Sequence, residues 1–163
     1  MRTFIDKILK RENEMSGAMS RSKGQRAERD VIKLLQPVVN KAWAEVMGDS
    51  EEPPKLQRNT LQSDEGGFDI VGLHWMALEV KHQEKLQIDK WWEQTVRQAK
   101  GKAEPILMYK QNNVKFRVRL WVNIWVHGHG AHIEEVVDVS VETFLRYFEK
   151  RLYSELKNRG HGK

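Results

Sequence analysis

Hydrophobic residues in the first third of the chain recur every three to four positions, a spacing that is typical of an amphipathic helix. The pattern is clearest over residues 22–36, and Ser20 and Ser22 are both suitable N-caps for a helix there. Pro37 is expected to end or kink this helix, because proline lacks the backbone N–H that a helix interior uses. Residues 38–47 would then continue as a further helical piece.

Residues 1–20 carry only a short apolar repeat, which is followed by polar sequence. We interpret them as an arm, helical in part, that is loosely attached or packed on a partner subunit. Residues 21–163 are expected to form one domain, since the whole chain of 163 residues is within the usual size of a single domain.

Beyond an acidic linker with two prolines, the pattern changes to the alternation that is typical of β-strands. Strands are expected over residues 56–61, 68–73, 75–81, 104–110, 116–126 and 133–140, and helices over 86–100 and 141–156. In the longest strand, Val118 and Ile124 belong to the side predicted to face the core, and Arg117 and Trp125 to the other side. This order predicts an α/β domain with a central mixed β-sheet flanked by helices.

The composition excludes several classes of protein. The chain has no cysteine, which removes disulfides, thiolate metal sites and cysteine nucleophiles and fits an intracellular location. No stretch approaches the roughly 20 consecutive apolar residues of a membrane span, and the N-terminus lacks the apolar core of a signal peptide. We therefore expect a cytoplasmic protein with no membrane partner.

The charge distribution suggests an anionic partner. The net charge is +5, and the basic residues are clustered. Five of them fall within residues 21–33, and no acidic residue lies between Glu104 and Glu134. Because phosphate binding needs cations gathered on one surface, this clustering favours nucleic acid as the partner.

Three charged residues lie in the stretch around the third expected strand. Glu79 and Lys81 are two positions apart and therefore share one face of that strand, while Val80 points to the other face. Antiparallel pairing through the short turn at residues 72–74 would bring Asp69 beside Glu79. Two carboxylates held together repel each other unless a cation lies between them, and their oxygens suit Mg²⁺. The alternative is an ordinary solvated face of a sheet.

Glu28 adds a fourth charge to this group. It lies on the flank of the apolar face of the expected helix, on the side shared by Val31 and Leu35. A carboxylate there is aimed at the surface on which the helix packs, and the sheet that carries Asp69 is the obvious candidate. The alternative is a lone acid that complements the dipole at the N-terminus of the helix.

The segments KGQRAERDVIKLL, FDIV and LEVK together resemble the PD-(D/E)xK nuclease superfamily, and within it most closely the archaeal-type Holliday-junction resolvases. The resemblance covers residues 22–100, and it implies a restriction-endonuclease-like core for a nuclease domain over residues 21–163. It implies four catalytic residues, which are Glu28, Asp69, Glu79 and Lys81. The metal ligands would be Asp69, Glu79, Glu28 and the main-chain carbonyl of Val80. DNA contacts are expected from Lys23, Arg26, Arg29, Arg58, Ser63 and Gln98.

The activity that the resemblance implies is that of a Mg²⁺-dependent endodeoxyribonuclease, with Mn²⁺ able to substitute, which resolves four-way DNA junctions by paired symmetric nicks. The partners would be branched DNA and a second copy in a homodimer, whose two-fold symmetry matches that of the junction. The alternatives are another nuclease of the superfamily, acting in restriction, repair or phage DNA processing, and a non-catalytic DNA-binding module. The complete set of four charged residues disfavours the module. Cellular and phage origin both stay open.

Three further features have two interpretations each. Gln94 and Gln98 flank the apolar stripe of the helix over 86–100, where a solvated face competes with a place near the site. The basic and aromatic side of the longest strand could lie along a nucleic-acid backbone, although we favour a subunit interface. The histidines of residues 127–132 lack the spacing of usual zinc sites, so a flexible or phosphate-facing loop is preferred.

Overall fold

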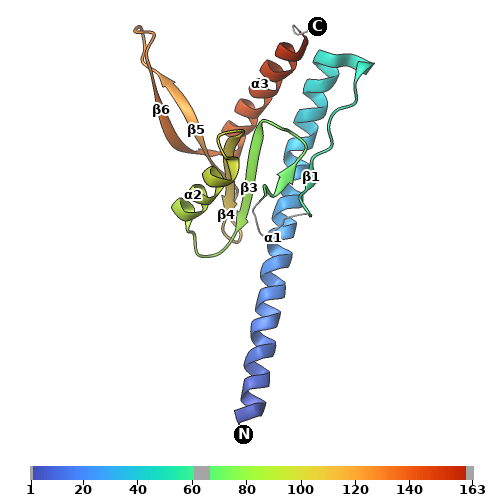
Figure 1. Ribbon diagram of the computed structural model, residues 1–163, viewed down its shortest axis with the longest axis vertical. Helices are drawn as coiled ribbons and strands as arrows, with labels where there is room; N and C mark the ends of the chain where they lie inside the picture. The colour runs from blue at the N-terminus through green and yellow to red at the C-terminus, as the bar shows by residue number, and fades with distance from the viewer. Residues whose placement is uncertain (1, 61–66, 161–163) are drawn as a thin grey trace.

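The computed structural model describes residues 2–60 and 67–160, with side chains over 17–60 and 67–159 (Figure 1). Its elements are α1 (Arg2–Met47), a short 3₁₀ turn (Gly48–Ser50), β1 (Gln57–Arg58), β2 (Ile70–Val71), β3 (Met76–His82), α2 (Ile88–Ala99), β4 (Glu104–Lys110), β5 (Arg117–Trp125), β6 (His132–Ser140) and α3 (Val141–Gly160). The strands form one sheet in the order β1-β2-β3-β4-β5-β6. All neighbouring pairs are antiparallel except β3 and β4, which are parallel and joined through α2. The predicted α/β fold with a central mixed sheet is therefore confirmed.

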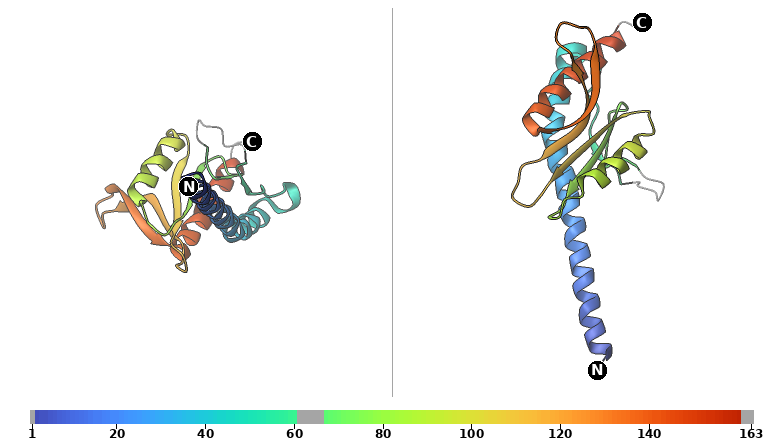
Figure 2. Two further views of the ribbon diagram at one scale, coloured as in Figure 1. Left: turned by 90° about the horizontal axis from the view of Figure 1, so that it is seen from below. Right: turned by 90° about the vertical axis from the view of Figure 1, so that its left-hand side faces the viewer.

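Helices cover both faces of this sheet (Figures 1 and 2). α1 and α3 pack on one face, where Leu78 and Val80 of β3 belong to the main hydrophobic cluster. α2 packs on the other face, where Trp91 belongs to a second cluster with Leu107 of β4. Successive side chains of a strand point to opposite faces, so Glu79, between Leu78 and Val80, points to the α2 side.

The first helix is longer than expected. α1 runs without interruption from Arg2 to Met47. The prediction of a separate helix that begins at Ser20 or Ser22 is therefore wrong, and Pro37 does not end the helix. Every fourth residue of its inward face is buried on both sides of Pro37, for example Val31, Leu35 and Val39. This packing outweighs the loss of one backbone hydrogen bond at an exposed proline.

The N-terminal part of α1 extends beyond the sheet, away from the rest of the chain (Figures 1 and 2). Residues 2–20 of the predicted arm are therefore helical, and they belong to the same helix, α1, that packs on the sheet farther along the chain. Neither α1 nor any other helix in the described part of the chain combines the length and the apolar character of a membrane-crossing helix.

The two strands at one edge of the sheet exist but are short. β1 and β2 each have two residues, because the backbone turns immediately after Val71. Gly72 adopts a φ of +130°, which favours glycine, and a Cβ on it would lie 2.8 Å from the carbonyl oxygen of Lys55. This close approach lets the β2–β3 connection pack against the segment that leads into β1.

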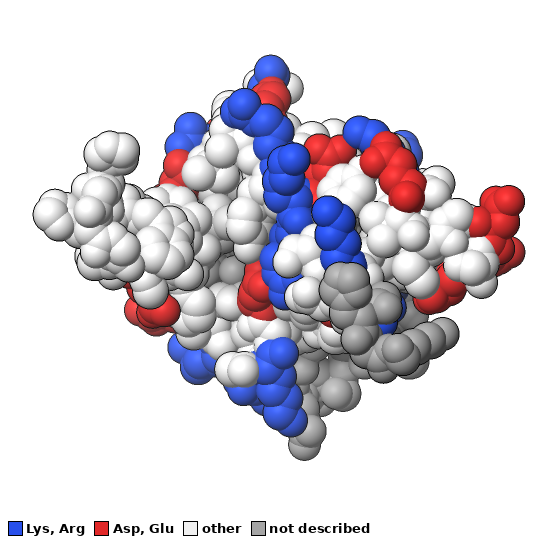
Figure 3. All heavy atoms as spheres, turned by 90° about the horizontal axis from the view of Figure 1, so that it is seen from above, with Lys and Arg blue, Asp and Glu red and all other residues white. Residues whose placement is uncertain are grey.

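At the opposite edge, β5 and β6 form a ribbon whose far end projects from the body (Figure 1). The core-facing prediction is confirmed for Val118, which is buried, but wrong for Ile124, which is 46% exposed. Ile124 lies in the part of the ribbon that diverges from α3, so no helix covers it (Figures 1 and 2). Trp125 is 65% exposed, and the end of the ribbon, at the left of Figure 3, shows no charged side chain.

Candidate active site

The site is built on the pairing of β2 with β3. The register places Ile70 opposite Leu78, so the residue before Ile70 and the residue after Leu78 also face each other. These residues are Asp69 and Glu79, and they are 8% and 3% exposed. The backbone N–H of Val80 donates a hydrogen bond of 2.7 Å to Oδ2 of Asp69. Two buried carboxylates are thus held side by side on the α2 face of the sheet.

Glu79 is only partly satisfied in this position. Nζ of Lys81 donates to its Oε1 at 2.5 Å, and Nε2 of Gln94 on α2 approaches the same oxygen at 3.4 Å. The other oxygen, Oε2, is buried and has no hydrogen-bond partner among the described residues. Burial and repulsion by Asp69 raise the pKa of Glu79 from 4.5 to about 7, although Lys81 acts in the opposite direction. The attraction of Lys81 therefore does not offset the burial of the Glu79 carboxylate and its repulsion by Asp69.

The predicted helix acid, Glu28, approaches the site from α1. The guanidinium of Arg58 on β1 forms a hydrogen-bonded ion pair with it, and both side chains are largely shielded from solvent. Glu28, Arg58, Asp69 and Lys81 all line one recess of about 310 Å³ between α1 and the end of β3. The structure thus brings together residues that lie more than fifty positions apart in the sequence.

The chemistry of the donor set fits a divalent cation at Asp69 and Glu79. An unpartnered buried oxygen and a repelled carboxylate are what a cation between the two residues would satisfy. Val80 lines the same recess and would add its carbonyl, as the sequence resemblance implies. Glu28 is held by Arg58, and the described residues contain no group of three acidic, histidine or cysteine side chains placed to hold a metal. The direct ligands would therefore be the Asp69–Glu79 pair.

The residues predicted to contact DNA do not all lie at this recess. Lys23, Arg26 and Arg29 are exposed on α1, where they border the recess without lining it. Gln98 is farther along α2, and its Oε1 is buried with no hydrogen-bond partner among the described residues. Ser63 lies outside the residues that the structure describes. The roles of these side chains stay predictions.

Gln94, for which two interpretations were open, lies near the site, and His82 lies there without having been predicted. Gln94, one helical turn before Gln98, is the α2 glutamine that reaches Glu79, and its position between the buried Trp91 and Thr95 could have shown this. His82 follows Lys81 and lines the recess, with its Nε2 3.0 Å from Oδ1 of Asn112. No sequence pattern indicates this contact, because thirty residues separate the two side chains.

A mixed sheet with an Asp immediately before its second strand and a Glu and a Lys on its third defines the class as a PD-(D/E)xK nuclease. Residues 19–150 match the profile of a family described as "Phage putative PDDEXK endonuclease". The match covers most of the chain, and the protein therefore belongs to this family of endonucleases.

Other comparisons add little detail. No curated protein matches the chain. Among solved structures, Hjc, a Holliday junction resolvase from the archaeal hyperthermophile Archaeoglobus fulgidus, is similar with a TM-score of 0.43 and 19% sequence identity. That match covers 76% of this chain and 96% of Hjc.

Proposed function

We propose that the protein is a Mg²⁺-dependent endodeoxyribonuclease that cuts branched DNA, and four-way junctions in particular, by paired symmetric nicks. The observation that carries the proposal is the buried Asp69–Glu79 pair, in which one oxygen of Glu79 has no partner within the described part of the chain and Lys81 stands beside the other. Mn²⁺ would substitute for Mg²⁺, because both prefer oxygen ligands.

In this mechanism Asp69 and Glu79 hold the cation, and the recess bounded by α1 admits the phosphodiester. A bound Mg²⁺ would acidify an attacking water and neutralise charge on the phosphate. Lys81 is fixed by its hydrogen bond to Glu79, so its ammonium is placed to orient the water or to stabilise negative charge that develops at phosphorus. Arg58 neutralises Glu28 and thereby reduces its repulsion of the phosphate.

Two features support branched DNA as the substrate. Residues 22–100 resemble archaeal-type resolvases, and the basic residues of α1 border the recess from the side on which the helix projects. Contacts of this kind bind phosphates and recognise shape rather than base sequence. A homodimer would present two such sites, and its two-fold symmetry would allow each to nick one of two opposed strands. Cleavage of linear duplex DNA is the second candidate, since the family description names an endonuclease without a branched substrate.

The test compares three labelled substrates of one sequence: a four-way junction, a Y-fork and a linear duplex. Each is incubated with the purified protein in Mg²⁺, in Mn²⁺ and in EDTA. Paired symmetric nicks that are confined to the junction and absent in EDTA would support the proposal. Equal cutting of the linear duplex would replace it with a general endonuclease. Binding without any cutting in either metal would show a DNA-binding module instead.

A further inference from the structure

The turn between β4 and β5 lies beside the candidate active site. Oδ1 of Asn112 in this turn is 3.0 Å from Nε2 of His82 and accepts a hydrogen bond of 3.5 Å from Nζ of Lys23 on α1. His82 lines the same recess as Asp69 and pairs with Lys110 across β3 and β4. Asn112 therefore joins three segments, the first helix, the end of β3 and the β4–β5 turn, at the edge of the recess.

Positive charge accumulates at this junction of segments. Burial lowers the pKa of His82, and the charges of Lys110 and Lys23 lower it further. Neither lysine forms an ion pair with a carboxylate in the described part of the chain, and Nζ of Lys110 lies 4.8 Å from the ring centre of Phe116. Glu84 also lies at this turn, where its side chain accepts a hydrogen bond of 3.4 Å from the backbone N–H of Asn112.

Lys23 and Lys110 both lie beside His82, and neither has a carboxylate as an ion-pair partner in the described part of the chain, so a bound anion would be attracted to both ammonium groups. The side chain of Asn112 also carries two N–H donors in addition to the oxygen that Lys23 and His82 approach. Because His82 borders both this cluster and the recess, the anion that fits both places is a nucleic-acid backbone rather than a single small ion.

We propose that Lys23, Lys110 and Asn112 form a second phosphate-binding site, which holds the DNA backbone next to the phosphodiester in the recess. This inference rests on the proposed function, and it adds the β4–β5 turn to the surface that binds the substrate. The contact would position the DNA strand without base specificity, because contacts to phosphate carry no sequence information.

The test measures binding without cleavage. Affinity for a labelled four-way junction and a duplex is measured by fluorescence anisotropy in EDTA between about 50 and 200 mM NaCl. Loss of one phosphate contact makes the slope of log K against log salt shallower by about 0.9, which corresponds to about eightfold weaker binding near 100 mM. Lys110→Gln is expected to show this shallower slope on both substrates. Lys110→Arg keeps the positive charge and is expected to show the wild-type slope.

Lys150→Gln is the matched control. Lys150 is an exposed lysine on α3, away from the recess, so the same change of charge there should leave the slope unchanged. Asn112→Asp keeps the size of the side chain but places a carboxylate between the cations, and it should weaken binding more than Lys110→Gln does. A wild-type slope in both Lys110→Gln and Asn112→Asp would overturn the inference.

The same measurements separate this inference from the proposed function. If the wild type binds DNA with a Lys110-dependent slope but cuts no substrate, the second phosphate site stands and the nuclease proposal falls. If the wild type cuts junctions and neither turn variant changes the slope, the nuclease proposal stands and the second site falls. A wild type that binds no DNA would overturn the second site outright.

Discussion

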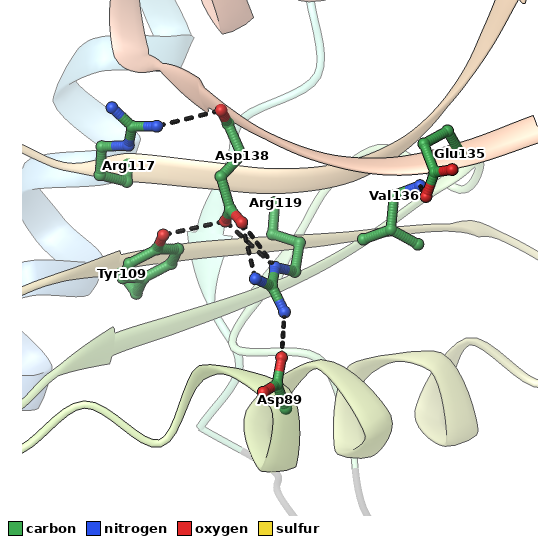
Figure 4. Close-up of polar contacts among 7 residues, drawn as sticks. All are labelled: Asp89, Tyr109, Arg117, Arg119, Glu135, Val136 and Asp138. Carbon is green, nitrogen blue, oxygen red and sulfur yellow. Dashed lines mark hydrogen bonds and ion pairs between the residues drawn. The ribbon is translucent and has the colours of Figure 1, made fainter.

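Two charged clusters lie on the α2 face of the sheet, and they are built in opposite ways. In the first, Asp138 of β6 accepts hydrogen bonds from Arg119 at 2.6 to 3.1 Å and from the hydroxyl of Tyr109 at 2.9 Å (Figure 4). Arg119 also donates to Asp89 of α2 at 2.6 Å. In the second, Glu79 has a buried oxygen with no partner among the described residues.

The pKa shifts follow this difference. Burial alone would raise the pKa of Asp138, but the hydrogen bonds from Arg119 and Tyr109 outweigh it and hold that pKa below its ordinary value. Burial dominates at Glu79, and repulsion by Asp69 adds to it, so its pKa rises to about 7. The first cluster is therefore complete without a ligand and stabilises the fold. The second leaves a buried oxygen of Glu79 without a partner among the described residues, which is why we propose a cation there.

The largest expected effect is on catalysis by the incomplete cluster. Asp69→Asn keeps the shape of the side chain but removes a charge that the cation requires. Cleavage of a four-way junction in Mg²⁺, measured under single-turnover conditions, should fall by more than about 100-fold. DNA affinity in EDTA should not fall, because Asp69 lines the recess as an anion and supplies no positive charge to the phosphates. Metal-dependent cleavage at the wild-type rate would refute the site assignment.

The complete cluster should show its effect on stability instead. Arg119→Met removes the guanidinium that bonds both Asp138 and Asp89, and the free energy of unfolding should fall by about 3 kcal/mol because Arg119 is mostly buried. Urea denaturation monitored by circular dichroism measures this change. Lys115→Met is the control, since Lys115 forms an exposed pair with Glu142 and should cost less than about 1 kcal/mol. Equal losses in the two variants would contradict the comparison.

The third prediction concerns the cluster of Asp69 and Glu79 and its effect on how the folding stability depends on pH. The pKa of Glu79 is higher in the folded chain than its ordinary value of 4.5, so the folded state binds the proton more tightly. Stability of the wild type should therefore fall as pH rises from about 4.5 to about 7, by about 2 kcal/mol relative to Glu79→Gln. Urea denaturation at several pH values measures the difference. Addition of Mg²⁺ should reverse it, and a difference that is independent of pH and metal would contradict the assignment.

The smallest effect is expected from the helix that bridges the two clusters. Gln94 approaches Glu79 at 3.4 Å, so Gln94→Ala should lower the cleavage rate by about tenfold with little change in DNA affinity. Gln98→Ala is the matched comparison on the same helix, and it should leave the cleavage rate unchanged. A larger loss of DNA affinity in Gln98→Ala than in Gln94→Ala would instead support the DNA contact that the sequence predicts for Gln98.

Local geometry explains what could be predicted from the sequence. The alternation around Val80 places Glu79 and Lys81 on one face wherever a strand forms, and a tight turn at Gly72 leaves one pairing that sets Asp69 beside Glu79. The fold class follows from the same periodic patterns. Such features depend on neighbours within a few residues, or on one short hairpin.

Features that depend on distant segments could not be predicted. Ile124 alternates as a core residue does, yet its exposure is decided by where α3 diverges from the ribbon. Pro37 indicates a helix end by itself, but the packing of residues on both sides of it overrides that signal. The pairing of Arg58 with Glu28 likewise depends on how α1 crosses the edge of the sheet, which no local pattern contains.

The packing of α1 against α3 has a consequence for the synthesis of the chain. The strands pair in the order in which they are made, which favours rapid folding of the sheet. The inward face of α1, which includes Val39 and Trp43, shares its core with Phe148 and Leu156 of α3, which is translated after strands β1 to β6. A nascent chain therefore keeps an uncovered apolar face on α1 until α3 has been translated. Since α1 also forms one wall of the recess, the position of that wall depends on the packing of α3 on α1.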